Sequence, residues 1–101
     1  MAISDLDSLT LSLTEELIAR HSVSPDDDGC QQLLASHLEE MGFEIGHLPF
    51  GDVSNIWATR PGTEASPLLA FAGHTDVVPP GPASEWETDP FVPTLVDGVL
   101  Y

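Results

Sequence analysis

A run of seven residues without a polar side chain, residues 67–73 (PLLAFAG), constrains the fold more than any other feature. A strand with one face in water alternates polar and apolar residues, and this run does not alternate. Unbroken apolar runs of this length are typical of strands that are covered on both faces. We therefore predict a buried strand over residues 67–73, in a fold with layers on both sides of a sheet.

Two amphipathic helices are predicted before this strand. The first rests on leucines spaced by three and four residues, with Ser4 and Asp7 as a candidate cap and an end near Arg20. The second is expected to begin at the three aspartates of residues 26–28, whose charge suits a helix N-terminus, and to end at Gly42. The apolar face of the second helix is formed by Cys30, Leu33, Leu34, Leu38 and Met41.

Short strands complete the pattern. Residues 43–48 and 55–59 are predicted as strands joined by a turn at residues 51–52, and residues 79–93 hold five prolines and are expected to be irregular. Asp97-Gly98 between short apolar runs is a hairpin signal. Helices and strands in this order predict an α/β fold in which helices pack on a sheet.

Composition excludes several classes of partner. Two basic residues stand against 17 acidic ones, for a formal charge of −15, and such a surface repels nucleic acid and anionic lipid. No run approaches the roughly 20 apolar residues that cross a bilayer, and acidic residues occupy the N-terminus where a secretory signal carries positive charge. The one cysteine, Cys30, cannot form an internal disulfide. We expect a cytoplasmic protein that acts on a small molecule.

The predicted buried strand ends at His74-Thr75-Asp76, the most informative triplet in the chain. In open α/β sheets, functional residues gather beyond the carboxyl ends of the strands. Residues two apart in extended backbone project to the same side, so Asp76 can accept a hydrogen bond from the ring nitrogen of His74 that faces away from a metal. The spacing alone leaves a second interpretation open, a satisfied core histidine beside a surface carboxylate.

Longer motifs surround this triplet. Residues 73–81 (GHTDVVPPG), Trp86, residues 89–93 (DPFVP) and residues 97–101 (DGVLY) resemble the first zinc motif of the M20 metallopeptidase family. Further segments also resemble landmarks of that family: residues 22–25 (SVSP), 28–31 (DGCQ), 42–43 (GF), 51–53 (GDV) and 55–58 (NIWA). The resemblance runs from about Leu13 to Tyr101.

The resemblance implies a role for two residues. His74 matches the family's histidine ligand to one zinc, and Asp76, the candidate catalytic residue, matches the aspartate that supports that histidine. It further implies a site of two divalent metals, zinc with cobalt as an alternative, whose other ligands and glutamate base this sequence does not contain. Residues 1–101 are then expected to be the N-terminal part of a three-layer αβα catalytic domain with a mixed sheet, in an enzyme that forms homodimers.

Two other functions are compatible with part of the sequence. Another enzyme of the family, such as an acetylornithine deacetylase or a dipeptidase, would share the His-x-Asp triplet. A non-catalytic acidic domain that binds a partner would need a self-sufficient fold of this length. We expect the chain alone to be inactive, because it lacks the general base and most of the metal ligands that the resemblance implies. We also expect it to be marginally stable or prone to aggregate, because residues 67–73 need neighbours on both faces.

Overall fold

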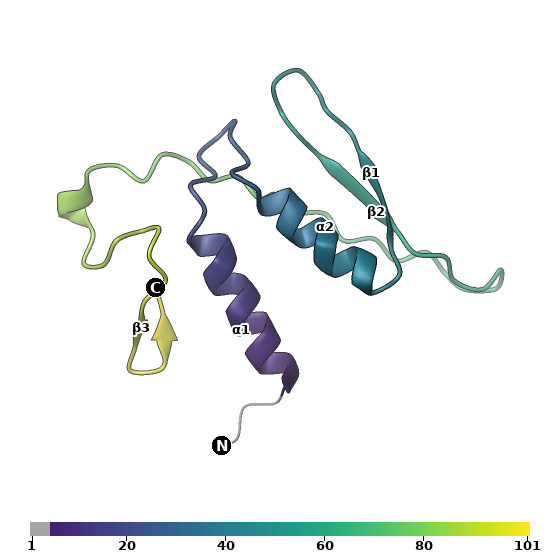
Figure 1. The fold of residues 1–101 in the computed structure, drawn as a ribbon, viewed down its shortest axis with the longest axis horizontal. Helices are drawn as coiled ribbons and strands as arrows, with labels where there is room; N and C mark the ends of the chain where they lie inside the picture. Colours follow the sequence, from purple (N-terminus) through teal and green to yellow (C-terminus); the bar gives the residue numbers. More distant parts are fainter. Residues whose placement is uncertain (1–4) are drawn as a thin grey trace.

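Within residues 5–101, two α-helices and two antiparallel hairpins make up the fold (Figure 1). The computed structural model describes residues 5–101. The helices are α1 (Asp5–Ile18) and α2 (Cys30–Glu40), and a short 3₁₀ helix, η1 (Ala83–Glu85), lies in the proline-rich segment. Strands β1 (Glu44–His47) and β2 (Ile56–Thr59) form the first hairpin, and β3 (Leu95–Val96) and β4 (Val99–Leu100) form the second. This content is consistent with the predicted α/β class.

The two helices lie close to their predicted positions. Helix α1 ends at Ile18, as expected, whereas Ser4 of the predicted cap lies outside the described residues. The predicted start of the second helix at residues 26–28 is wrong, because α2 begins at Cys30. Asp28 and Gly29 have positive φ angles of 49° and 81°, so the backbone turns there and cannot be helical.

The predicted strands before residue 60 and the turn between them are confirmed. In the β1–β2 hairpin Glu44 pairs with Thr59 and His47 pairs with Ile56. Phe50 and Val53 close the turn by two backbone hydrogen bonds, of 2.8 and 3.1 Å. Helix α2 packs against this hairpin.

The hairpin predicted at the end of the chain is also present. Leu95 pairs with Leu100 and Val96 with Val99. Asp97 and Gly98 have φ angles of 50° and 81°, the pair of positive values that a two-residue type I′ turn requires.

The prediction of a buried strand over residues 67–73 is wrong. The segment has no strand pairing, and Leu68 is 96% and Phe71 92% exposed. A strand forms when neighbours pair its N–H and C=O groups and cover its side chains. Within residues 5–101 no strand lies alongside it, so the segment crosses the molecule as an irregular, open chain (Figure 1).

Little apolar surface is buried in this arrangement. Among the described side chains, the buried hydrophobic ones are Cys30 and Ala35, both on α2, which confirms that Cys30 is a core residue. The radius of gyration is 16.4 Å, whereas a compact domain of this length has one of about 13 Å. Within the part of the chain that the structure describes, no helix is long and apolar enough to cross a membrane.

Candidate metal-binding site

Two segments far apart in the sequence come together around the His-x-Asp triplet. Val23 and Val77 form a parallel β-bridge. The Ser24 N–H donates to the Val77 carbonyl at 3.0 Å, and the Val77 N–H donates to the Ser22 carbonyl at 2.9 Å. The loop that follows α1 therefore holds the backbone immediately after the triplet.

Side chains of the same loop tie down the middle of the triplet. The hydroxyl of Ser22, a residue only 3% exposed, donates to the Thr75 carbonyl at 2.9 Å. The Thr75 hydroxyl donates to Asp27 Oδ1 at 3.0 Å. Asp27 Oδ2 accepts the backbone N–H of Gln31, in the first turn of α2, also at 3.0 Å. The triplet is thus linked through Asp27 to the start of α2.

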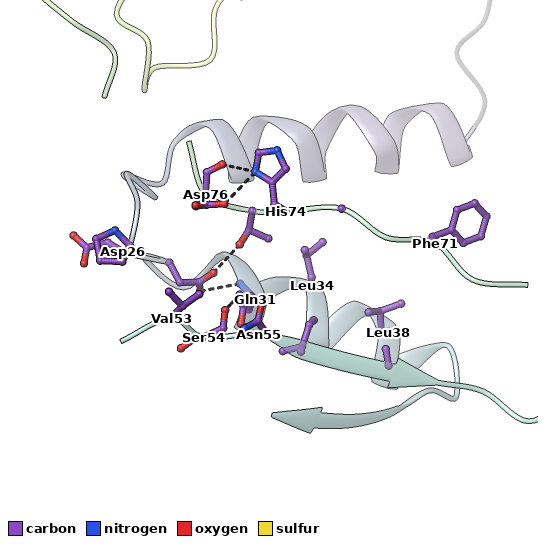
Figure 2. A pocket seen from close by; sticks show the side chains of 16 residues that line it. Asp26, Gln31, Leu34, Leu38, Val53, Ser54, Asn55, Phe71, His74 and Asp76 are labelled. Carbon is purple, nitrogen blue, oxygen red and sulfur yellow. Dashed lines mark hydrogen bonds and ion pairs between the residues drawn. The ribbon is translucent and has the colours of Figure 1, made fainter. Parts of the chain in front are cut away.

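The imidazole of His74 and the carboxylate of Asp76 are in direct contact, as the sequence predicts (Figure 2). His74 Nδ1 lies 3.0 Å from Asp76 Oδ1 and 2.8 Å from the Asp76 backbone oxygen. A carbonyl oxygen can only accept a hydrogen bond, so Nδ1 must carry the proton. In the neutral ring Nε2 then keeps its lone pair, and the His74 side chain is 82% exposed.

The second oxygen of Asp76 is also engaged. The Ser24 hydroxyl donates to Asp76 Oδ2 while Oδ1 faces His74. The hydrogen bond from Ser24 is the largest cause that lowers the pKa of Asp76 below its usual value, and the contact with His74 lowers it further. Asp76 is therefore ionised at neutral pH and acts as a fixed acceptor for the imidazole.

This arrangement suits a metal ligand. Histidines that bind metals through one ring nitrogen commonly donate the other N–H to a carboxylate or carbonyl, which fixes the tautomer and raises the basicity of the ligand. A carboxylate oxygen and a backbone carbonyl oxygen, both of Asp76, face His74 Nδ1–H, so zinc would bind to Nε2. In residues 5–101 no group of three or more His, Cys, Asp or Glu side chains is placed to hold a metal.

The triplet borders an open groove of about 400 Å³ between α2, β2 and residues 71–76 (Figure 2). Its floor combines apolar side chains of α2, such as Leu34, with polar groups of Gln31 and Asn55. Gln31 Nε2 donates to the Ser54 carbonyl at 2.7 Å, which ties α2 to the chain just before β2.

Comparison with known proteins identifies relatives of the chain. No family model matches the chain. Over 93% of its length, however, it is 61% identical to succinyl-diaminopimelate desuccinylase of Methylobacillus flagellatus. It is 59% identical over 94% of its length to the enzyme of that name in Bordetella petrii, and 58% identical over 91% to the one in Thioalkalivibrio sulfidiphilus. The chain is a homologue of succinyl-diaminopimelate desuccinylases. It spans 24% of the length of each of these relatives, which is consistent with a fragment of such a protein.

Trp86 and Phe91, two aromatic residues of the family motifs, line a second cavity that His74 of this desuccinylase homologue also borders. The His21 ring stacks on Phe91, with ring centroids 4.1 Å apart and planes 19° from parallel. Trp86 Nε1 donates to the Pro80 carbonyl at 2.8 Å, so this ring packs within the proline-rich segment.

Sequence reasoning missed the residues that hold the pair in place. The sequence predicts no role in the site for Ser22, Ser24 or Asp27, although the first two belong to the motif of residues 22–25 that the family resemblance includes. Their contacts span about fifty residues of sequence, and neither periodicity nor spacing carries a signal at that distance.

Proposed function

We propose that the chain is part of a zinc-dependent amidohydrolase of the M20 type. Its substrate would be N-succinyl-L,L-2,6-diaminopimelate, hydrolysed to succinate and L,L-diaminopimelate on the route to diaminopimelate and lysine. The names and identities of the relatives support this substrate. The observation that carries the chemistry is the His74 ring, held through Nδ1 by a carboxylate with its other nitrogen free.

Each of the two residues has a distinct role in this proposal. His74 binds one metal through Nε2. Asp76 accepts a hydrogen bond from His74 Nδ1–H and so keeps the ring in the Nδ1–H tautomer. It also stabilises the positive charge that the ring gains when Nε2 binds the metal. A pair of divalent metals, zinc or zinc with cobalt, supplies Lewis-acid activation of water and of the amide carbonyl when bound.

The remaining parts of the machinery come from outside this sequence. Zinc takes three or four protein ligands, and the resemblance assigns one of them, His74, to this chain. We therefore propose that residues 1–101 alone hydrolyse no amide. In the whole protein we expect a three-layer αβα domain with a mixed sheet, a homodimer and a cytoplasmic location.

The test is an activity assay on the complete coding product that contains these residues. With zinc added, it should release succinate from N-succinyl-L,L-diaminopimelate faster than it deacylates N-acetylornithine or cleaves a dipeptide. His74→Ala should reduce kcat/KM by more than 100-fold, and Asp76→Ala by about 10- to 100-fold, the usual loss for a residue that supports a ligand. His47→Ala, on the exposed strand β1, is the matched control and should leave the rate unchanged.

Three results would contradict the proposal. Full activity in His74→Ala would remove the metal role of this residue. A faster reaction with N-acetylornithine or a dipeptide would place the protein with another branch of the family, and a complete product without any hydrolysis would favour an acidic binding domain.

A further inference from the structure

The carboxylate of Asp76 is gripped from two sides by residues of different segments. Oδ1 faces the His74 ring at 3.0 Å, and Oδ2 accepts the hydroxyl of Ser24. The Ser24 Oγ also lies 3.4 Å from the Val77 carbonyl, but a hydroxyl has one proton and the carboxylate contact is the shorter. Ser24 therefore directs its hydrogen bond at Asp76.

Asp76 needs such a grip because little else restrains it. Its side chain is 45% exposed and follows an open, irregular segment. A carboxylate with this freedom can rotate into water, and holding it in one rotamer costs conformational entropy that another contact must offset. Without that contact the His74 N–H would face only the Asp76 backbone carbonyl.

Ser24 is itself held firmly enough to act as the anchor. Its backbone N–H donates to the Val77 carbonyl at 3.0 Å, next to the Val23–Val77 bridge. Neighbouring contacts have a different task. Ser22 donates to the Thr75 carbonyl and Asp27 accepts from the Thr75 hydroxyl, so both hold Thr75 and neither contacts the Asp76 carboxylate.

We propose that Ser24 is a positioning residue for the metal ligand: its hydroxyl orients the Asp76 carboxylate so that His74 stays in the Nδ1–H tautomer with Nε2 presented to the metal. The inference rests on the proposed function in one respect, the assignment of His74 as a ligand. The orientation of the ring is independent of that assignment and can be measured without a metal.

The test is the tautomer ratio of His74 in the 101-residue chain, measured by long-range ¹H–¹⁵N NMR at a pH where imidazoles are neutral. In the unmodified chain the Nδ1–H form should dominate. Ser24→Ala should lower the ratio of Nδ1–H to Nε2–H by about two- to tenfold, the factor that one hydrogen bond of ordinary strength is worth. Ser24→Thr keeps the hydroxyl at an exposed position and should restore the ratio.

Two control variants separate orientation from folding. Ser36→Ala removes a hydroxyl that bonds only within α2, to the Gln32 carbonyl, and should leave the ratio unchanged. Ser22→Ala loosens the backbone of the same loop without touching the carboxylate. If Ser22→Ala lowered the ratio as much as Ser24→Ala does, general docking of the loop would explain the effect and the positioning role would be overturned.

The activity assay on the complete coding product distinguishes the two proposals. An unchanged ratio in Ser24→Ala overturns the role of Ser24, whatever the activity of His74→Ala. A lowered ratio that Ser24→Thr restores supports the role. If His74→Ala then keeps full activity in the complete product, the metal assignment of the proposed function fails while the orientation of the ring by Ser24 stands.

Discussion

Residues 67–73 and residues 74–77 are neighbours in the chain and are treated in opposite ways by the fold. The first segment is apolar, yet Leu68, Leu69 and Phe71 are between 78% and 96% exposed. The second has three polar residues followed by Val77, and each of its residues is hydrogen-bonded to the loop at residues 22–27 or, for His74, to Asp76. The site is thus better ordered by its contacts than the apolar segment that leads to it.

The difference follows from the range of the two kinds of interaction. A hydrogen bond needs one partner at the right distance, and one nearby loop supplies several. Burial of an apolar strand needs neighbours along its full length and on both faces. Residues 5–101 provide the loop and do not provide the neighbouring strands. The hydrogen bonds of residues 74–77 are therefore formed, whereas the side chains of residues 67–73 stay exposed.

The largest expected effect concerns the apolar segment. Exposed side chains of this size associate in water, and each one that becomes buried in an aggregate contributes about 1.5–3 kcal/mol. The double variant Leu69→Asp and Phe71→Asp should therefore raise the concentration at which the 101-residue chain self-associates by about tenfold or more. Light scattering and sedimentation velocity across a dilution series measure this threshold.

The control for this variant is Glu64→Ala with Glu87→Ala. These glutamates are exposed and lie outside the apolar segment, and their loss reduces the negative charge instead of raising it. The control chain should self-associate at the original concentration or a lower one. If the unmodified chain stays monomeric at high concentration, exposure of residues 67–73 does not cause self-association and the prediction is wrong.

A medium effect is expected from single residues on the two sides of the comparison. Ser22→Ala removes the hydrogen bond to the Thr75 carbonyl in a buried place and should lower the free energy of unfolding by about 1–3 kcal/mol. Leu68→Ala removes a larger side chain that is 96% exposed and should change it by less than about 0.5 kcal/mol. Urea denaturation of both variants measures the difference.

The ranking of these two variants is the informative result. If residues 67–73 were the buried strand that the sequence predicts, Leu68→Ala would cost about 2–5 kcal/mol and would exceed Ser22→Ala. That outcome would reject the open conformation of the segment in solution.

The same comparison explains which parts of the fold could be predicted from the sequence. Helix α2 and the β1–β2 hairpin follow from local patterns, since the apolar spacing around Leu34 and the turn at residues 51–52 act within a few residues. The apolar run at residues 67–73 is equally plain in the sequence. Its structure could not be predicted, because it depends on neighbours that a local pattern does not specify.

The candidate site divides in the same way. The contact of His74 with Asp76 joins residues two apart, so extended backbone geometry was sufficient to predict it. Ser24 lies 52 residues from Asp76 in sequence, and only the folded chain shows that its hydroxyl reaches the carboxylate. The roles of His74 as a metal ligand and of Asp76 as its support stay predictions.

The smallest expected effect is on the titration of Asp76. The hydrogen bond from Ser24, followed by that from His74, lowers the pKa of this carboxyl in the folded chain. Because the pKa of Asp76 is lower in the folded chain than in the unfolded one, its ionised form stabilises the fold at pH values above the usual carboxyl pKa. This contribution is lost as the pH falls through the lowered pKa. Ser24→Ala should raise the pKa of Asp76 toward its usual value, which a ¹³C NMR titration of the side-chain carboxyl detects. Ser36→Ala should leave it in place, and an equal shift in both variants would mean that the carboxylate senses general loosening and not the loss of its anchor.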